Sequence, residues 1–344
     1  MVTSSPSLMP MSNGRDWSAE IEILAGQLTE HYVFPDVAEQ VGRLLRERLA
    51  GGAYRDLADE AALESVVTRD LQSVNGDKHL SIQHSEQEIP RKQDPVVDTG
   101  RLRAERAMLT GHGFARIERK PGNVGLLDIR EFNEPSVAGA GDMTIAAMHL
   151  IASADALLID LRRNSGGEPD MVALVSGFLF DERTHLVDLY FPAAGRTIQY
   201  WTAPFVPGPV FGGSKPVYVL TSARTVSGGE GMSYQLQQCK RATLVGETTM
   251  GAANFHYPYR VSAHLMSTVP SGYPVDPVSG GHWEGTGVRP DIPVPADRAL
   301  DTAYRLALEH VLGLGEHGAR RQIAAAARQA LAELTGGAFD SAAR

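Results

Sequence analysis

The sequence has little cysteine, no long apolar run and no excess of positive charge, and each shortage excludes a class of protein. Cys239 is its single cysteine, so no disulfide within the chain is possible. No run of 18 apolar residues occurs among the 344, so we expect no membrane-spanning helix. The net charge of −9 gives no electrostatic reason to bind nucleic acid or an anionic membrane.

The first residues, MVTSSPSLMPMSNGRDW, lack the basic stretch followed by an apolar stretch that marks a secretory leader. We therefore expect a soluble, cytoplasmic protein. Cys239 falls on a predicted helix beside Lys240, and we interpret it as a buried, inert thiol.

The chain divides into an N-terminal helical part and a larger mixed part. Apolar residues recur at helical spacing in three segments of the first part, which predicts a small bundle. We predict these regions: a flexible tail at 1–15, a helical bundle at 16–75, a strand and linker carrying His79 at 76–112, an α/β core at 113–315, and a C-terminal helix and tail at 316–344.

Within the core, apolar strands alternate with helical segments. The runs ALLIDLR (156–162) and PVYVLTS (216–222) each begin with a continuous apolar stretch, as is typical of strands buried on both faces. Repeated strand-helix-strand units of this length predict α/β layers with mostly parallel strands. No internal repeat of 20–50 residues is visible.

The segment LLIDLRRNSGGEPD places a glycine-containing turn, 164–167, between a strand and a helix that begins near Pro169. Glycines leave backbone N–H groups exposed, and N–H groups near a helix N-terminus favour anions. The alternative is an ordinary turn between a strand and a helix. Neither the dinucleotide fingerprint nor the Walker pattern is present here, so nucleotide binding is unsupported.

The segment VYVLTSARTVSGGEGMSYQL places Ser227 between a buried strand and a helix. A serine there could act as a nucleophile, because the helix dipole favours negative charge on its oxygen and the N–H of Gly228 could donate to an oxyanion. A simpler interpretation is a capping box formed by Ser227 and Glu230. The two roles are compatible, since the helix start that Ser227 caps would also activate it.

A serine nucleophile needs a base near neutral pH and a group that orients the base. His79, in GDKHLSI, and Glu284, in HWEGTGVRPDI, are candidates for these roles. The chain holds eleven histidines, so position alone does not separate His79 from a histidine with no catalytic role. His256 and His282 are the next candidates for the base.

Taken together, four segments resemble the S41 serine peptidases, which include the tail-specific and C-terminal processing proteases. They are GNVGLLDIREF, LLIDLRRNSGGEPDMVALVSGFLF, the long segment from KPVYVLTSARTVSGGE to GETTMGAANF, and WEGTGVRPDIPV. They resemble most the branch that contains tricorn protease and the repeats of the interphotoreceptor retinoid-binding protein. The resemblance runs from about residue 16 to about residue 310 and implies a ClpP/crotonase-like core of stacked β-β-α units.

The resemblance also implies roles for individual residues. Ser227 falls on the family's nucleophile, and Gly228 and Gly166 fall on the two residues whose N–H groups form the oxyanion hole. Gly167 is the neighbouring alternative to Gly166. His79 falls on the tricorn-type base and Glu284 on its acidic partner. No metal and no organic cofactor are implied.

Three departures from the family pattern limit the mechanism. The processing proteases use a Ser-Lys dyad with the lysine in a segment like GEKTFGKG, whereas the segment here is GETTMGAA, with Ala252 at the lysine position. Lys78 stands where the tricorn-type site has a serine, and a cation there would lower the pKa of His79. Residues 85–112 are too few for the PDZ module of the processing proteases, so we expect none.

The sequence therefore predicts a serine hydrolase of the S41 peptidase type that acts on a peptide or a small acyl substrate, with Ser227, His79 and Glu284 as its catalytic residues. One alternative is a non-proteolytic enzyme of acyl transfer or cleavage in a biosynthetic pathway. The other is a carrier of apolar ligands like the retinoid-binding relatives. The family resemblance leaves a homo-oligomer open.

Overall fold

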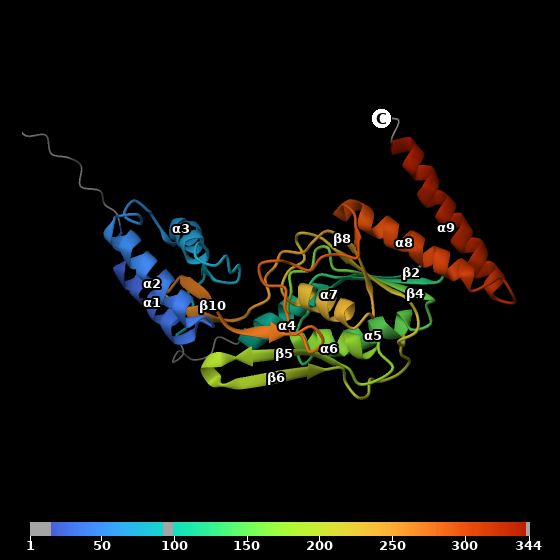
Figure 1. Cartoon of the computed structure of the whole chain (residues 1–344), viewed down its shortest axis with the longest axis horizontal. Coiled ribbons are helices and arrows are strands. Elements are labelled where there is room, and N and C mark those ends of the chain that lie inside the picture. The colour runs from blue at the N-terminus through green and yellow to red at the C-terminus, as the bar shows by residue number, and fades with distance from the viewer. Residues whose placement is uncertain (1–14, 92–98, 342–344) are drawn as a thin grey trace, which may run out of the picture. The chain divides into compact units, whose positions relative to one another are not determined.

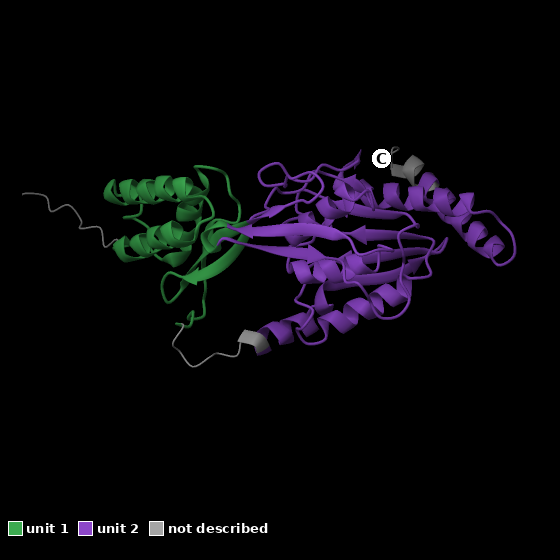
Figure 2. Cartoon of the chain, turned by 60° about the horizontal axis from the view of Figure 1, so that its bottom comes forward, with its two compact units in different colours: residues 1–97, 192–194, 255–272 green, residues 98–191, 195–254, 273–344 purple. Residues whose placement is uncertain are grey.

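The computed structural model describes residues 15–91 and 99–341. The chain forms two compact units, which Figure 2 shows in green and purple. Unit 1 comprises residues 1–97, 192–194 and 255–272, and unit 2 comprises residues 98–191, 195–254 and 273–344. Segments far apart in the sequence therefore contribute to each unit. The predicted tail at 1–15 lies, except for Arg15, outside the described residues.

Unit 1 begins with three helices, as the helical spacing of apolar residues predicts. In the first of them Ile21, Leu24 and Leu28 are buried. Asp59 caps the third helix, since its side chain accepts a hydrogen bond from the N–H of Ala62 at 2.8 Å. The helices are α1 (Ser18–His31), α2 (Pro35–Ala50) and α3 (Glu60–Gln72).

A later part of the chain supplies unit 1 with strands. Strand β1 (Ser81–His84) pairs antiparallel with β10 (Leu265–Val275), and Ser81 lies opposite Thr268. Strand β9 (Phe255–Arg260) also pairs antiparallel with β10. Strands β9 and β10 thus form a hairpin, and they complete the unit that the N-terminal helices begin. The 3-10 turn η2 (Pro192–Ala194) belongs to the same unit.

Unit 2 is built on a six-stranded sheet with the order β11-β8-β7-β4-β3-β2. Five of the strands run parallel, and only β2 is antiparallel to its neighbour β3. Continuous apolar sequence explains why the middle strands are buried on both faces. The strands are β2 (Phe114–Lys120), β3 (Val124–Ile129), β4 (Ala156–Asp160), β7 (Val217–Thr221), β8 (Thr243–Gly246) and β11 (Ile292–Pro293).

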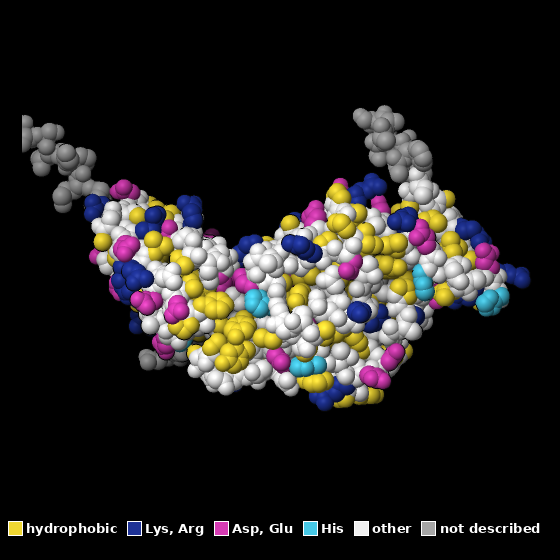
Figure 3. All heavy atoms as spheres, viewed as in Figure 1, with side chains coloured by type: hydrophobic (Ala, Val, Ile, Leu, Met, Phe, Trp, Pro, Cys, Tyr) yellow, Lys and Arg dark blue, Asp and Glu magenta, His cyan; other side chains and the backbone are white. Residues whose placement is uncertain are grey.

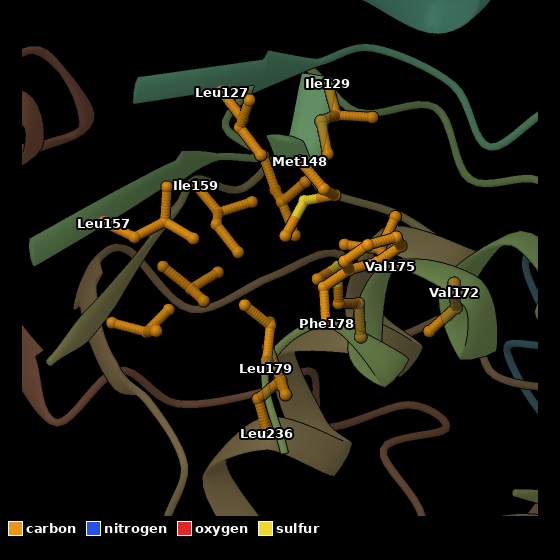
Figure 4. Close-up of a cluster of buried hydrophobic side chains, with 14 of the residues drawn as sticks. Leu127, Ile129, Met148, Leu157, Ile159, Val172, Val175, Phe178, Leu179 and Leu236 are labelled. Atoms are coloured by element: carbon orange, nitrogen blue, oxygen red, sulfur yellow. The ribbon is translucent and has the colours of Figure 1, made fainter. Parts of the chain in front are cut away.

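Helices cover both faces of this sheet and enclose a hydrophobic cluster on each side. In the cluster of Figure 4, side chains of β3 and β4 such as Leu127 and Ile159 meet Val175 and Leu236 of the helices. Helix α8 (Ala296–Gly313) covers the other face and packs against α9 (Arg320–Ser341). The helices of the first face are α5 (Ala140–Ile151), α6 (Pro169–Gly177) and α7 (Gly228–Gln238). The α/β prediction is confirmed.

Some elements differ from the sequence prediction. Residues 85–112, interpreted as a linker, contain helix α4 (Thr99–Leu109), followed by the 3-10 turn η1 (Gly111–Gly113). Arg, Leu, Ala and Glu in α4 are good helix formers, but of residues 101–109 only Ala107 is buried, so the sequence of this helix shows no clear apolar stripe. The sequence analysis also overlooked the hairpin of β5 (His185–Phe191) and β6 (Arg196–Trp201), which are paired antiparallel in unit 2.

Basic and acidic side chains are interspersed on the face of the molecule that Figure 3 shows. Among residues 15–91 and 99–341, no helix has the length and apolar character needed to cross a membrane.

Candidate active site

The two glycine-containing turns singled out in the sequence meet at one edge of the sheet in unit 2. Strands β4 and β7 are neighbours and run parallel, with Asp160 opposite Leu220, so the turns that follow them leave the sheet side by side. A Cβ atom built on Gly166 would lie 2.8 Å from the Cβ of Ser227 and 3.2 Å from its Oγ. The sheet topology therefore brings the 164–167 turn into contact with Ser227.

Ser227 has an unusual backbone conformation, with φ 54° and ψ −118°. Such a positive φ is strained for a residue with a side chain, and strain of this kind is concentrated at functional sites. Ser227 directly precedes α7, and its N–H donates to the Glu230 carboxylate at 2.9 Å. The local structure is a tight turn from strand to helix with a serine at its apex, as in enzymes that expose a serine nucleophile.

Two backbone N–H groups beside Ser227 are available for an oxyanion. The N–H of Gly166 is not one of them, because it donates to the Oδ1 of Asn164 at 2.8 Å. Among the described residues, the N–H groups of Gly167 and Gly228 have no hydrogen-bond partner. A Cβ built on Gly228 would lie 3.0 Å from the nitrogen of Gly167, so the two groups are close together.

Asn164 holds these turns in place and is fully buried. Its side chain accepts from Gly166 and donates to the carbonyl of Ile129 at 3.0 Å. Its own carbonyl accepts the N–H of Val226 at 3.3 Å. Asn164 therefore links β3, the glycine turn and the residue before Ser227, a role that the sequence analysis did not assign to it.

Glu230 is also fully buried, and its carboxylate accepts hydrogen bonds from two segments. Besides the N–H of Ser227, it accepts from the hydroxyl of Thr249 at 2.5 Å and from the N–H groups of Gly251 at 2.6 Å and Ala252 at 2.9 Å. Burial raises the pKa of Glu230, while these hydrogen bonds act in the opposite direction. Besides completing a capping box, Glu230 therefore connects the start of α7 to residues 249–252.

Glu284 binds the two residues that follow those bound by Glu230. Its Oε2 accepts from the N–H groups of Ala253 at 2.6 Å and Asn254 at 3.1 Å. Ala252, which the sequence resemblance sets at the position of the processing-protease lysine, is 1% exposed, and its methyl group has no proton to exchange. Unit 2 therefore contains a serine, two available N–H groups and two carboxylates, whereas Ala252 supplies no base.

His79 belongs to unit 1, where its ring lies against the ring of His256 with centroids 4.6 Å apart. The backbone N–H of His79 donates to the side chain of Asp77 at 3.0 Å. Burial, followed by the charge of His256, lowers the pKa of His79 to about 3. The direction agrees with the sequence analysis, but the cause differs, because Lys78 is not among the groups that shift this pKa.

Of the residues predicted for the site, unit 2 holds Ser227, Gly228, Gly166, Gly167 and Glu284, and unit 1 holds His79. Gly166 lies against Ser227 and Gly228, and Gly228 lies against Gly167, so the four residues form one cluster. The sequence analysis assigned no role to Asn164 and Thr249 and only a capping role to Glu230. Of these three residues only Glu230 had a recognisable sequence signal, since an acidic residue three positions after Ser227 is typical of a capping box.

Two family models match the chain. The model of peptidase family S41 matches residues 123–294, which contain the glycine turn, Ser227 and Glu284. The model described as the N-terminal domain of Peptidase_S41 in eukaryotic IRBP matches residues 15–109, which contain the three helices and His79.

Solved structures support the same fold. A lipoprotein from Streptococcus agalactiae is similar with a TM-score of 0.58 at 13% identity, over 89% of this chain and 99% of that one. The tricorn protease is similar with a TM-score of 0.52 at 14% identity, over 90% of this chain but 36% of its own length.

A third similar structure, titled photosystem II D1 C-terminal processing protease, matches at 21% identity and a TM-score of 0.41. That match covers 51% of this chain and 43% of the protease, so the chain spans less than half of this relative. The S41 family model, in contrast, extends over half of the chain, 172 of 344 residues. The chain therefore belongs to peptidase family S41.

Proposed function

We propose that this protein is a serine hydrolase of the S41 peptidase type that cleaves peptide or related acyl bonds through an acyl-enzyme on Ser227. The observation that carries the proposal is the contact between Ser227, at the apex of a strained turn, and the glycine turn with its available N–H groups. A nucleophile and donors for a developing oxyanion are the two parts that acyl transfer requires first.

In this mechanism the Oγ of Ser227 attacks the substrate carbonyl carbon, and its proton passes to the Nε2 of His79. The carbonyl oxygen gains negative charge and accepts hydrogen bonds from the N–H groups of Gly228 and Gly167. Of the two glycines considered for the second donor we choose Gly167, since Asn164 already binds the N–H of Gly166. The loss of one such donor lowers turnover by roughly 10²–10³-fold.

The imidazolium of His79 then donates its proton to the leaving group, which departs and leaves an ester on Ser227. A water molecule attacks this ester, His79 takes the water's proton, and the acid product is released while the proton returns to Ser227. We assign to Glu284 the role of orienting the imidazole through the N–H on Nδ1. The Nδ1 of His79 is buried without a hydrogen-bond partner among the described residues, which favours such a role.

His79 is the base we choose because Ala252 excludes the lysine dyad. Burial lowers the pKa of His79 to about 3, which keeps the imidazole in the neutral form that can accept a proton but makes it a weaker base than a histidine near its ordinary pKa. Its neighbour His256 is the closest alternative by position, with the ring centroids 4.6 Å apart. Substituting each histidine separately by alanine distinguishes them, since only loss of the true base should abolish acylation of Ser227.

A fluorophosphonate probe tests the proposal directly, because it reacts with activated serines and needs no knowledge of the substrate. We expect the native protein to be labelled on Ser227, as mapped by peptide mass spectrometry, and expect no labelling of Ser227→Ala. Absence of labelling, while a known serine hydrolase reacts under the same conditions, would refute the active nucleophile.

A peptide library then tests the bond that is cleaved. We expect mass spectrometry to detect cleavage products with the wild type and none with Ser227→Ala. Labelling of Ser227 without any peptide cleavage would favour the non-proteolytic acyl chemistry. Binding of an apolar ligand that is equal in wild type and Ser227→Ala, with no labelling, would favour the carrier.

A further inference from the structure

The segment 249–254 passes between the two carboxylates of the site in unit 2, and the way it is held carries a further inference. Four consecutive backbone N–H groups are shared between them: Gly251 and Ala252 donate to Glu230, and Ala253 and Asn254 donate to Glu284. The segment is therefore fixed at both ends by charge-assisted hydrogen bonds, which are stronger than neutral ones.

Thr249 connects this segment to two other parts of the site. Its hydroxyl donates to the Oε1 of Glu230 at 2.5 Å and accepts the N–H of Val288 at 2.8 Å. Val288 lies four residues after Glu284, and its carbonyl in turn accepts the N–H of Thr249 at 3.2 Å. Thr249 is 6% exposed, so water does not compete freely for these bonds.

The hydrogen bonds form one continuous chain from the nucleophile to the segment that carries Glu284. It runs from the N–H of Ser227 to the carboxylate of Glu230, then to the hydroxyl of Thr249, and then to the backbone of Val288. Both carboxylate oxygens of Glu230 accept hydrogen bonds, and the hydroxyl of Thr249 both donates one and accepts one.

We propose that Thr249 and Glu230 are positioning residues that fix Ser227 relative to Glu284, so that the serine stays in its strained, reactive conformation. This inference rests on the proposed function and deepens it. A Ser-Lys dyad needs only two side chains in the correct position. The arrangement proposed here needs three, and the nucleophile, the base and the acidic partner come from separate segments. The acyl-transfer geometry therefore depends on how well those segments are held in register.

The experiment compares two substitutions at Thr249 that differ in a single property. Thr249→Val keeps the shape but removes both the donor and the acceptor, whereas Thr249→Ser keeps the hydroxyl. Fluorophosphonate labelling of Ser227 is measured over a range of probe concentrations, which separates initial binding of the probe from the first-order acylation step.

We expect Thr249→Val to slow the acylation step by roughly 10²-fold with little change in initial probe binding, and Thr249→Ser to restore a rate near that of the wild type. If Thr249 only stabilised the fold, Thr249→Val would not slow the acylation step while leaving initial probe binding unchanged. Thr144→Val is the matched control, since Thr144 is likewise buried and, within residues 15–91 and 99–341, its hydroxyl bonds only the sulfur of Met171. It should label like the wild type.

Glu230→Gln provides a second, independent variant, because an amide keeps the shape of the side chain but has one acceptor oxygen in place of two. We expect a slower acylation step here as well, and circular dichroism checks that each variant is folded. Labelling of folded Thr249→Val or Glu230→Gln at the wild-type rate would overturn the positioning role and leave the proposed function standing. Absence of labelling in the wild type would overturn both.

Discussion

At the scale of single residues, the burial of His79 has a consequence for stability that does not depend on its proposed catalytic role. In the folded protein the pKa of His79 is about 3, whereas a histidine in an unfolded chain titrates near 6.5. Between these values the unfolded state binds a proton that the folded state does not, so acid favours unfolding. The stability due to neutral, buried His79 is complete above about pH 6.5 and is lost as the pH falls toward 3.

We therefore expect wild type to lose more stability than His79→Gln on acidification, by roughly 2 kcal/mol between pH 7.5 and pH 5. Urea unfolding of both proteins at several pH values measures this difference, because contributions of the other titrating groups are common to both. Two parallel curves of unfolding free energy against pH would contradict the burial of a neutral His79.

Some residues of the candidate site could be predicted from the sequence and others could not. Ser227 and the glycine turn could be found because their surroundings in the sequence, an apolar strand followed by glycines and a helix, are local. The choice between Gly166 and Gly167 could not be made, since it depends on where the side chain of Asn164 points. Thr249 was overlooked for a similar reason, because its partners Glu230 and Val288 are 19 and 39 residues away.

At the scale of elements, α8 stabilises the sheet from the face opposite to α7. Leu308 of α8 is fully buried in the cluster that this helix forms with β3, β4 and β7. Leu308→Ala leaves a cavity and should lower the free energy of unfolding by roughly 2–5 kcal/mol.

Leu314, at the end of the same helix, is 39% exposed and provides the matched control. Leu314→Ala should change stability by less than about 0.5 kcal/mol. Both variants, when folded, should label on Ser227 like the wild type, because α8 packs on the other face of the sheet. Equal stability of the two variants in urea would show that α8 is not packed as described.

The elements predicted well from sequence are those with uniform burial. Strands β4 and β7 are apolar over most of their length because both faces of the sheet are covered, and such runs are easily recognised in the sequence. Strand β6 has a mixed pattern of exposed and half-buried residues, and α4 is dominated by charge, so neither has a clear period. Both were missed, since their position is decided by pairing and packing rather than by their own residues.

At the scale of the whole molecule, the units are not consecutive pieces of chain. Strand β10 supplies residues 265–272 to unit 1, and there Ser81 to His84 of β1 pair along it. A variant beginning at residue 98 would lack α1, α2, α3 and β1, and one edge of β10 would lose its partner. Exposed strand edges promote aggregation.

We expect this variant to aggregate during size-exclusion chromatography, whereas the full chain elutes as a defined species. A monodisperse shortened protein that still labels on Ser227 would contradict this expectation. It would also show that the N-terminal helices are dispensable for the nucleophile.

The composite unit 1 also has a consequence for protein synthesis. Unit 1 cannot be completed until residue 272 has left the ribosome, and by then residues 98–191 and 195–254 of unit 2 have already emerged. At ~5–20 residues per second, the three N-terminal helices wait on the order of ten seconds or more for their β partner. During that interval their apolar faces are open to chaperones and proteases, so folding of the newly made chain should depend on the order in which its segments appear.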